Sequence, residues 1–155
     1  MTDYTEAAKA KLPLTGMLAG VVGLVFLLVG ILGFIPGVTT NYNDMEFADR
    51  DSTAQLFGVF QVSILHNLVH LAFGVAGLAL MSRADTARWY LIGGGVIYLI
   101  LWIYGLVTDP DTSANFIPLN DADNWLHLGL GVAMVILGLL PPGVSSSKNR
   151  TPRRL

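Results

Sequence analysis

The chain has 155 residues, of which 53% are hydrophobic and 13% are charged, with a net charge of −2. Soluble domains carry about 25% charged residues, so much of this surface must face something other than water, and the charge gives no reason to expect nucleic acid as a partner. Cysteine is absent, which excludes disulfides, cysteine-ligated zinc and iron–sulfur clusters.

The first apolar run covers residues 14–35 and ends at Pro36-Gly37. Lys9 and Lys11 precede it, as basic residues precede the core of a signal peptide. That core is only about 7–15 residues long, whereas a transmembrane helix needs about 20 apolar residues. The length of the run therefore favours a retained membrane-spanning helix.

Three further apolar runs follow, at about residues 54–81, 89–107 and 124–140. Acidic loops separate the first run from the second and the third from the fourth. The sequence thus predicts an all-α integral membrane four-helix bundle over residues 14–140. A short N-terminus, 1–13, precedes the bundle, and a basic, Ser-rich tail, 141–155, is expected to be disordered.

The placement of basic residues predicts the orientation of the bundle. In a model with four spans, only Arg50 lies on the side of the acidic loops. The residues on the other side are Lys9, Lys11, Arg83, Arg88, Lys148, Arg150, Arg153 and Arg154. Because cytoplasmic loops carry an excess of Lys and Arg, both termini are expected in the cytoplasm.

Glycines in the first run predict a helix-packing face. Gly16, Gly23, Gly30 and Gly37 recur every seven residues, or about two helical turns, and so share one side. Small residues let membrane helices approach closely. This face fits packing within the chain and self-association equally, so a homo-oligomer or a larger membrane complex both stay open.

The second and fourth runs contain an internal repeat. His66-Asn67-Leu68-Val69-His70-Leu71-Ala72-Phe73-Gly74-Val75-Ala76 aligns without gaps with Asp123-Asn124-Trp125-Leu126-His127-Leu128-Gly129-Leu130-Gly131-Val132-Ala133. Both segments run in the same direction, whereas the first and third runs match only weakly. The pattern predicts a parallel repeat of two helical hairpins, with a pseudo-two-fold axis along the membrane normal.

The repeat predicts a polar cluster between the second and fourth helices. His70 lies about 16 Å from the cytoplasmic end of its run, and His127 about 20 Å, at 1.5 Å per residue. His66 and Asp123 lie one helical turn further out on the same faces. Asn67 and Asn124 lie beside this cluster, and Gly74 and Gly131 lie one turn below the two histidines.

Three interpretations of the cluster stay open. Neutral His and Asn side chains can hydrogen-bond between helices and hold the bundle in register. Alternatively, a transition metal could be bound by His66, His70, Asp123 and His127, whose side chains are common metal ligands. In a variant of this interpretation, Asp123 does not bind the metal but orients the ligand His127. For haem b, His70 and His127 would be the axial ligands, with Gly74 and Gly131 leaving room for the ring. The third interpretation is transfer of protons or a small solute through histidine.

Enzymatic chemistry has little support in the sequence. No Ser/His/Asp arrangement at useful spacing, no phosphate-binding Gly-rich loop and no carboxylate pair within a span is present. The protein is therefore expected to be a structural or accessory membrane component, with the lipid bilayer as its main partner.

The segments HNLVHLAFGVAGL and DNWLHLGLGVAMVILGLL resemble a family of small bacterial four-helix membrane proteins, frequent in actinobacteria, that is classed as a domain of unknown function. The resemblance extends from Leu14 to Leu140, and its most specific part is the HNxxH motif at His66, Asn67 and His70. It implies the fold and a bacterial plasma membrane location, and it implies no activity.

Overall fold

The structure is a computed structural model that describes residues 12–48, 52–108, 117 and 119–141. Within these residues the chain forms four α-helices, which confirms the expected four-helix membrane fold. Their bounds are α1 Leu14–Leu32, α2 Ile64–Leu80, α3 Ala84–Val107 and α4 Asp121–Leu139. In this part of the chain α1, α3 and α4 are long and apolar enough to cross a membrane, so the protein is a membrane protein. Helix α2, with 17 residues, is about 26 Å long, slightly less than a hydrocarbon core of about 30 Å.

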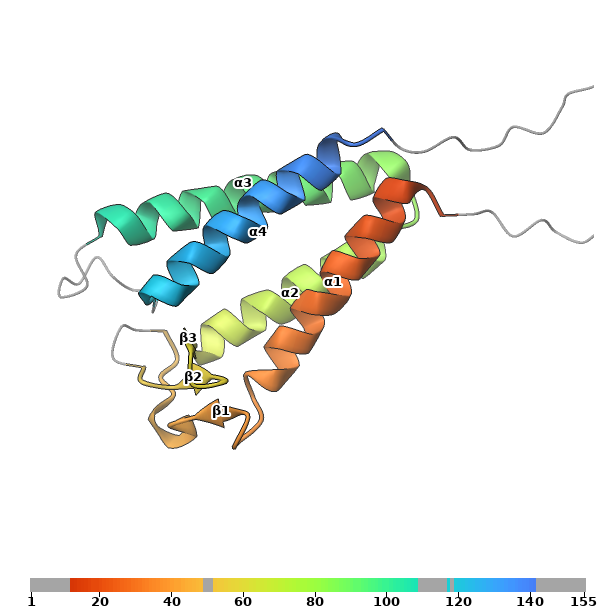
Figure 1. Ribbon diagram of the computed structural model, residues 1–155. Helices are drawn as coiled ribbons and strands as arrows, with labels where there is room; N and C mark the ends of the chain where they lie inside the picture. Colours follow the sequence, from red (N-terminus) through yellow and green to blue (C-terminus); the bar gives the residue numbers. More distant parts are fainter. Residues whose placement is uncertain (1–11, 49–51, 109–116, 118, 142–155) are drawn as a thin grey trace, which may run out of the picture.

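The helices form two hairpins, with α1 packed along α2 and α3 packed along α4 (Figure 1). The start of α1, the short α2–α3 connection and the end of α4 lie at the same end of the molecule. Apolar and aromatic side chains join the hairpins. This core consists of Ala19, Phe26, Ala87, Tyr90, Leu91, Tyr98 and Met134.

Glycine lets the two helices of the first hairpin approach at backbone distance. A Cβ atom on Gly23 would lie 2.9 Å from the carbonyl oxygen of Gly74, which no side chain can accept without a shift of the backbone. Gly16 and Gly30 likewise lie against backbone oxygens of Met81 and Asn67. The glycine face of α1 is therefore occupied by α2 of the same chain.

The second hairpin makes the same contacts at equivalent positions. A Cβ atom on Gly95 would lie 2.8 Å from the carbonyl oxygen of Gly131, as for Gly23 and Gly74 in the first hairpin. Leu99 covers Gly131, just as Leu27 covers Gly74. The internal repeat itself stays a prediction.

A small β-sheet lies at the opposite end of the molecule from the start of α1 and the end of α4, in a segment where the sequence predicts a loop and helix. Strands β1 Thr39–Thr40, β2 Gln55–Leu56 and β3 Phe60–Gln61 pair antiparallel in the order β1-β2-β3 within the described residues. Phe57 and Gly58 turn the chain between β2 and β3 with φ angles of 55° and 69°.

The second helix consequently begins at Ile64, and residues 55–61 form strands β2 and β3 and the turn between them. In and next to this segment, Ala54, Leu56 and Val62 are buried and pack into one cluster. Ser63 starts α2, because its hydroxyl accepts a hydrogen bond of 3.1 Å from the backbone N–H of His66. Gln61, expected within the second helix, instead lies in β3. The third helix begins at Ala84, five residues earlier than expected.

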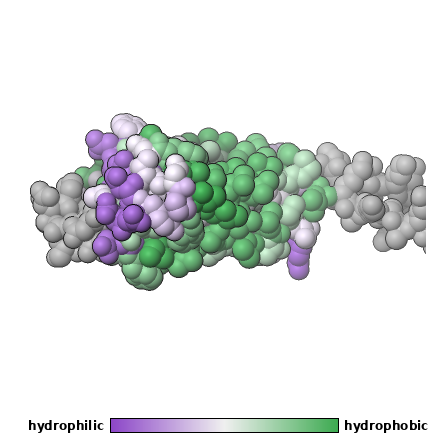
Figure 2. Space-filling view, turned by 90° about the horizontal axis from the view of Figure 1, so that it is seen from below, coloured by the Kyte–Doolittle hydropathy of each residue, from purple (hydrophilic) through white to green (hydrophobic). Residues whose placement is uncertain are grey.

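The surface divides along the length of the molecule (Figure 2). A broad hydrophobic belt covers the helices, and hydrophilic residues gather at the sheet end. Many large apolar side chains of the belt are half exposed, as they would be against lipid; examples are Val21, Ile100 and Ile136, at 61%, 58% and 55%. The expected disordered tail and most of the N-terminal segment fall outside the described residues.

Candidate functional site

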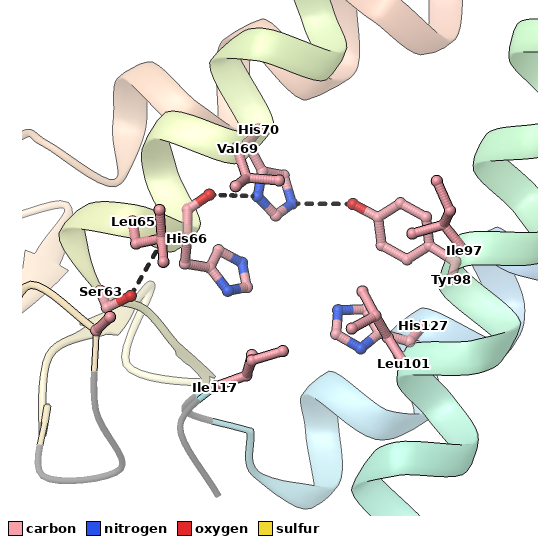
Figure 3. Close-up of a pocket in the computed structure, with 11 residues that line it drawn as sticks. Ser63, Leu65, His66, Val69, His70, Ile97, Tyr98, Leu101, Ile117 and His127 are labelled. Carbon is pink, nitrogen blue, oxygen red and sulfur yellow. Dashed lines mark hydrogen bonds between the residues drawn. The ribbon is translucent and has the colours of Figure 1, made fainter.

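A cavity of about 250 Å³ lies between α2 and the α3–α4 hairpin, near the sheet end (Figure 3). All three histidines of the sequence line it, together with Tyr98 of α3. No acidic side chain and no Lys or Arg is among the described residues around it. The remaining lining residues are Ala48, Ser63, Leu65, Val69, Ile97, Leu101 and Ile117. The structure therefore brings His66, His70 and His127 together in a largely apolar space.

His70 is hydrogen-bonded at both ring nitrogens. Its Nδ1 lies 2.9 Å from the carbonyl oxygen of His66, and its Nε2 lies 3.4 Å from the hydroxyl of Tyr98. Because a carbonyl oxygen can only accept, Nδ1 carries the proton of the neutral ring and Nε2 accepts from Tyr98. The lone pair that would bind a metal or a haem iron at Nε2 is thus directed at a tyrosine.

Aromatic contacts fix the rings around His70. The His66 ring stacks on it with centroids 4.4 Å apart and planes at 14°. Phe26 meets His70 edge-on at 5.5 Å, and Tyr98 meets His127 edge-on at 5.1 Å. Tyr98 therefore contacts both His70 and His127 at the wall of the cavity that the two imidazoles line.

His127 differs from its repeat partner His70. It is 3% exposed, and its Nδ1 is buried with no hydrogen-bond partner in the described chain. The ring nitrogens of His66 also make no hydrogen bond to the residues that the structure describes. A buried polar atom without a partner costs about 1–3 kcal/mol, so these nitrogens are the groups of the cavity that a ligand could satisfy.

Asp123, expected to join this cluster, is instead hydrogen-bonded to backbone N–H groups. Its Oδ2 accepts hydrogen bonds from the N–H of Asn120 at 3.1 Å and from the N–H of Gln61 at 3.0 Å. The Asn120 side chain in turn accepts from the Asp123 N–H, which completes a capping box at the start of α4. Asp123 thus joins α4 to β3 and does not hydrogen-bond the His127 ring.

Asn67 and Asn124 each fit against a glycine of the neighbouring helix. The Oδ1 of Asn67 occupies the position that a Cβ on Gly33 would take, and Asn124 does the same at Gly105. Neither Oδ1 has an N–H or O–H partner in the described chain. The two asparagines therefore set the register within each hairpin.

These positions do not fit a haem held by His70 and His127. Gly74 and Gly131, expected to leave room for the ring, are covered by Leu27 and Leu99. Phe26 and Tyr98 stack beside His70 with centroids 5.5 Å apart. Among the described residues, no group of three or more His, Asp or Glu side chains is placed to hold a metal ion.

Tyr98 is a residue of the site that the sequence analysis does not single out. A comparison of two segments could have pointed to Tyr98. These are Gly23-Leu24-Val25-Phe26-Leu27 and Gly95-Val96-Ile97-Tyr98-Leu99. Both have the glycine and the leucine that pack against the neighbouring helix in each hairpin. At this position the first segment has a phenylalanine and the second a tyrosine. The hydroxyl on Tyr98 is thus the feature that distinguishes it from Phe26.

We expect Tyr98→Phe to lower the free energy of unfolding by about 0.5–1.5 kcal/mol, the usual contribution of one hydrogen bond. A double-mutant cycle with His70→Phe should give a coupling energy of about 0.6 kcal/mol, typical of polar pairs between membrane helices. Unfolding in mixed micelles measures both values. Additive effects of the two substitutions would show that the hydroxyl and the imidazole do not interact.

A family model with the description Domain of unknown function (DUF4383) matches residues 17–140. The match covers most of the chain, so the chain belongs to this family. No curated protein and no solved structure matches it.

Proposed function

For a member of this family, we propose a role as a structural or accessory component of the bacterial plasma membrane, with both termini in the cytoplasm. The location of Arg83 and Arg88 supports this orientation. They lie in or next to the α2–α3 connection, at the same end as the start of α1 and the end of α4 (Figure 1). The positive-inside rule places that end in the cytoplasm and the sheet outside.

The structural role is supported by polar side chains that hydrogen-bond from one element of the bundle to another. Asp123 joins α4 to β3, Tyr98 joins α3 to His70 of α2, and Asn124 donates to the carbonyl oxygen of Gly105 at 3.3 Å. Each group thereby connects two elements. Such bonds contribute about 0.6–2 kcal/mol each in membranes and hold helices in register. The matched glycine contacts of the two hairpins support the proposed parallel repeat.

We expect His70→Ala to lower the free energy of unfolding by about 2 kcal/mol, because it removes two hydrogen bonds and a stacked ring. The purified wild-type protein and the variant should have the same metal content and the same visible absorption spectrum. Val75→Ala, which shortens a lipid-facing side chain on the same helix, is the control and should change stability little. Metal analysis and absorption spectroscopy on the detergent-purified protein, with unfolding in mixed micelles, test this prediction.

A transition-metal site is the second candidate. It is favoured by the Nδ1 of His127, which has no hydrogen-bond partner among the described residues, in a cavity that two further imidazoles line. Because the described side chains form no three-ligand group, the ion would need further ligands from outside them. A stoichiometric ion or pigment in the wild-type protein that is lost in His70→Ala or His127→Ala would establish this role and contradict the purely structural one.

A further inference from the structure

The histidine cavity lies beside a second hollow on the hydrophobic belt between α2 and α3, and the two together are called the groove. Three of its lining side chains, Leu65, Val69 and Ile97, are 38%, 43% and 45% exposed, so the cavity opens at the surface of these two helices. In a membrane, this surface faces acyl chains. The mouth of the cavity is therefore lateral and reached from the lipid.

The second hollow, of about 350 Å³, lies toward the start of α3, where Trp89 and Tyr90 line it. Ile97 borders both spaces. Small residues, Ala72 and Ala76 on α2 and Gly94 on α3, line the second hollow together with Phe73, Trp89 and Tyr90. The small side chains of Ala72 and Ala76 leave an apolar space that a hydrocarbon chain could occupy.

The polar end of the groove selects for a neutral group. No Lys or Arg is among the described residues lining the cavity, so a phosphate would have no countercharge, and no carboxylate faces it to hold an amine. Imidazole nitrogens both donate and accept hydrogen bonds. The Nδ1 of His127 and the ring nitrogens of His66, which have no hydrogen-bond partner among the described residues, suit a hydroxyl or carbonyl group.

We propose that this groove binds one neutral lipid bearing a hydroxyl or carbonyl group. The polar group would hydrogen-bond to His127 and His66, and the apolar chain would lie past Ile97 toward Ala72 and Gly94. His70 is not a ligand contact in this arrangement, because both its nitrogens are already bonded. This binding site goes beyond the structural role proposed above and does not depend on it.

Native mass spectrometry of the full chain in non-ionic detergent tests this site with four probes of similar chain length. These are a benzoquinone with a decyl chain, dodecanol, dodecane and dodecyl phosphate. We expect saturable one-to-one binding of the quinone, the alcohol or both, and no such binding of dodecane or the phosphate. Binding of the quinone alone would assign a ring carbonyl, and binding of the alcohol a chain-borne hydroxyl.

Two substitutions locate the bound probe. His127→Leu should weaken its binding about tenfold, the equivalent of one hydrogen bond of about 1.4 kcal/mol. Ala72→Phe fills the groove from the lipid-facing side and should abolish binding without touching the core. Ala133→Phe, the same change at an exposed position of α4 outside both hollows, is the matched control and should bind as the wild type does.

Three results would overturn the proposal. One is the lack of saturable binding of both the quinone and the alcohol. Another is binding of dodecane or dodecyl phosphate as tight as that of the neutral polar probes. The hydrogen bonds to the imidazoles would then not determine which probe binds. The third is equal binding by the Ala72→Phe and Ala133→Phe variants, which would place the probe elsewhere on the belt.

Discussion

Gly131→Val is expected to lower the free energy of unfolding by about 3 kcal/mol, the upper part of the usual cost of overpacking. A Cβ atom at this position would lie 2.8 Å from Cγ of Leu99 and 3.0 Å from the carbonyl oxygen of Gly95. The oxygen belongs to the backbone of α3, so relief requires the two helices to move apart. Separation of α3 from α4 would also remove contacts of Asn124 and His127 with α3.

Gly129 provides a matched control two residues away on the same helix. It is exposed, and nothing lies within 4 Å of a Cβ built on it. Gly129→Val makes the same change in helix propensity and hydrophobicity but should leave the unfolding free energy nearly unchanged. Titration with a denaturing detergent, followed by circular dichroism, measures both variants. Equal destabilisation by the two would contradict the close packing of α3 and α4 at Gly131.

Asp123→Ala should have an effect of similar size, about 3 kcal/mol, by a different mechanism. The substitution leaves two backbone N–H groups, those of Asn120 and Gln61, without their acceptor. Each unsatisfied buried donor costs about 1–3 kcal/mol, and loss of the helix cap is part of this effect. Asp123→Asn retains one side-chain oxygen and should therefore destabilise less.

Asp121→Ala separates capping from a general effect of acidic residues. Asp121 is also in the first turn of α4, but it is exposed and makes no side-chain hydrogen bond to the described residues. Its loss should cost only about 0.3–1 kcal/mol, through the helix dipole. Amide hydrogen exchange should show faster exchange at Gln61 in Asp123→Ala and unchanged exchange there in Asp121→Ala. The same exchange rate at Gln61 in both variants would rule out the link between α4 and β3.

The lengths of the apolar runs in the sequence were sufficient to predict the presence of the helices of this membrane protein. A run of about 20 apolar residues can satisfy its backbone in lipid only as a helix, so composition and length indicate α1, α3 and α4 directly. The repeated His residues of the second and fourth runs likewise pointed to positions that the structure places near each other. His66, His70 and His127 line one cavity because helical periodicity puts them on the inner faces of α2 and α4.

The tertiary structure decided the start of α2 and the partners of the polar residues. Residues 54–63 are apolar enough to be taken for helix, but pairing of β2 with Thr39 and Thr40 of β1 places residues 55–61 in the sheet and its turn. Asp123 was expected beside His127, yet the N–H of Gln61, distant in the sequence, holds its carboxylate. Tyr98 was not anticipated, because its role depends on a hydrogen bond between α3 and His70 of α2. Periodicity along one helix reports which face is buried, whereas the atom that meets a buried polar group is set by the packing of distant segments.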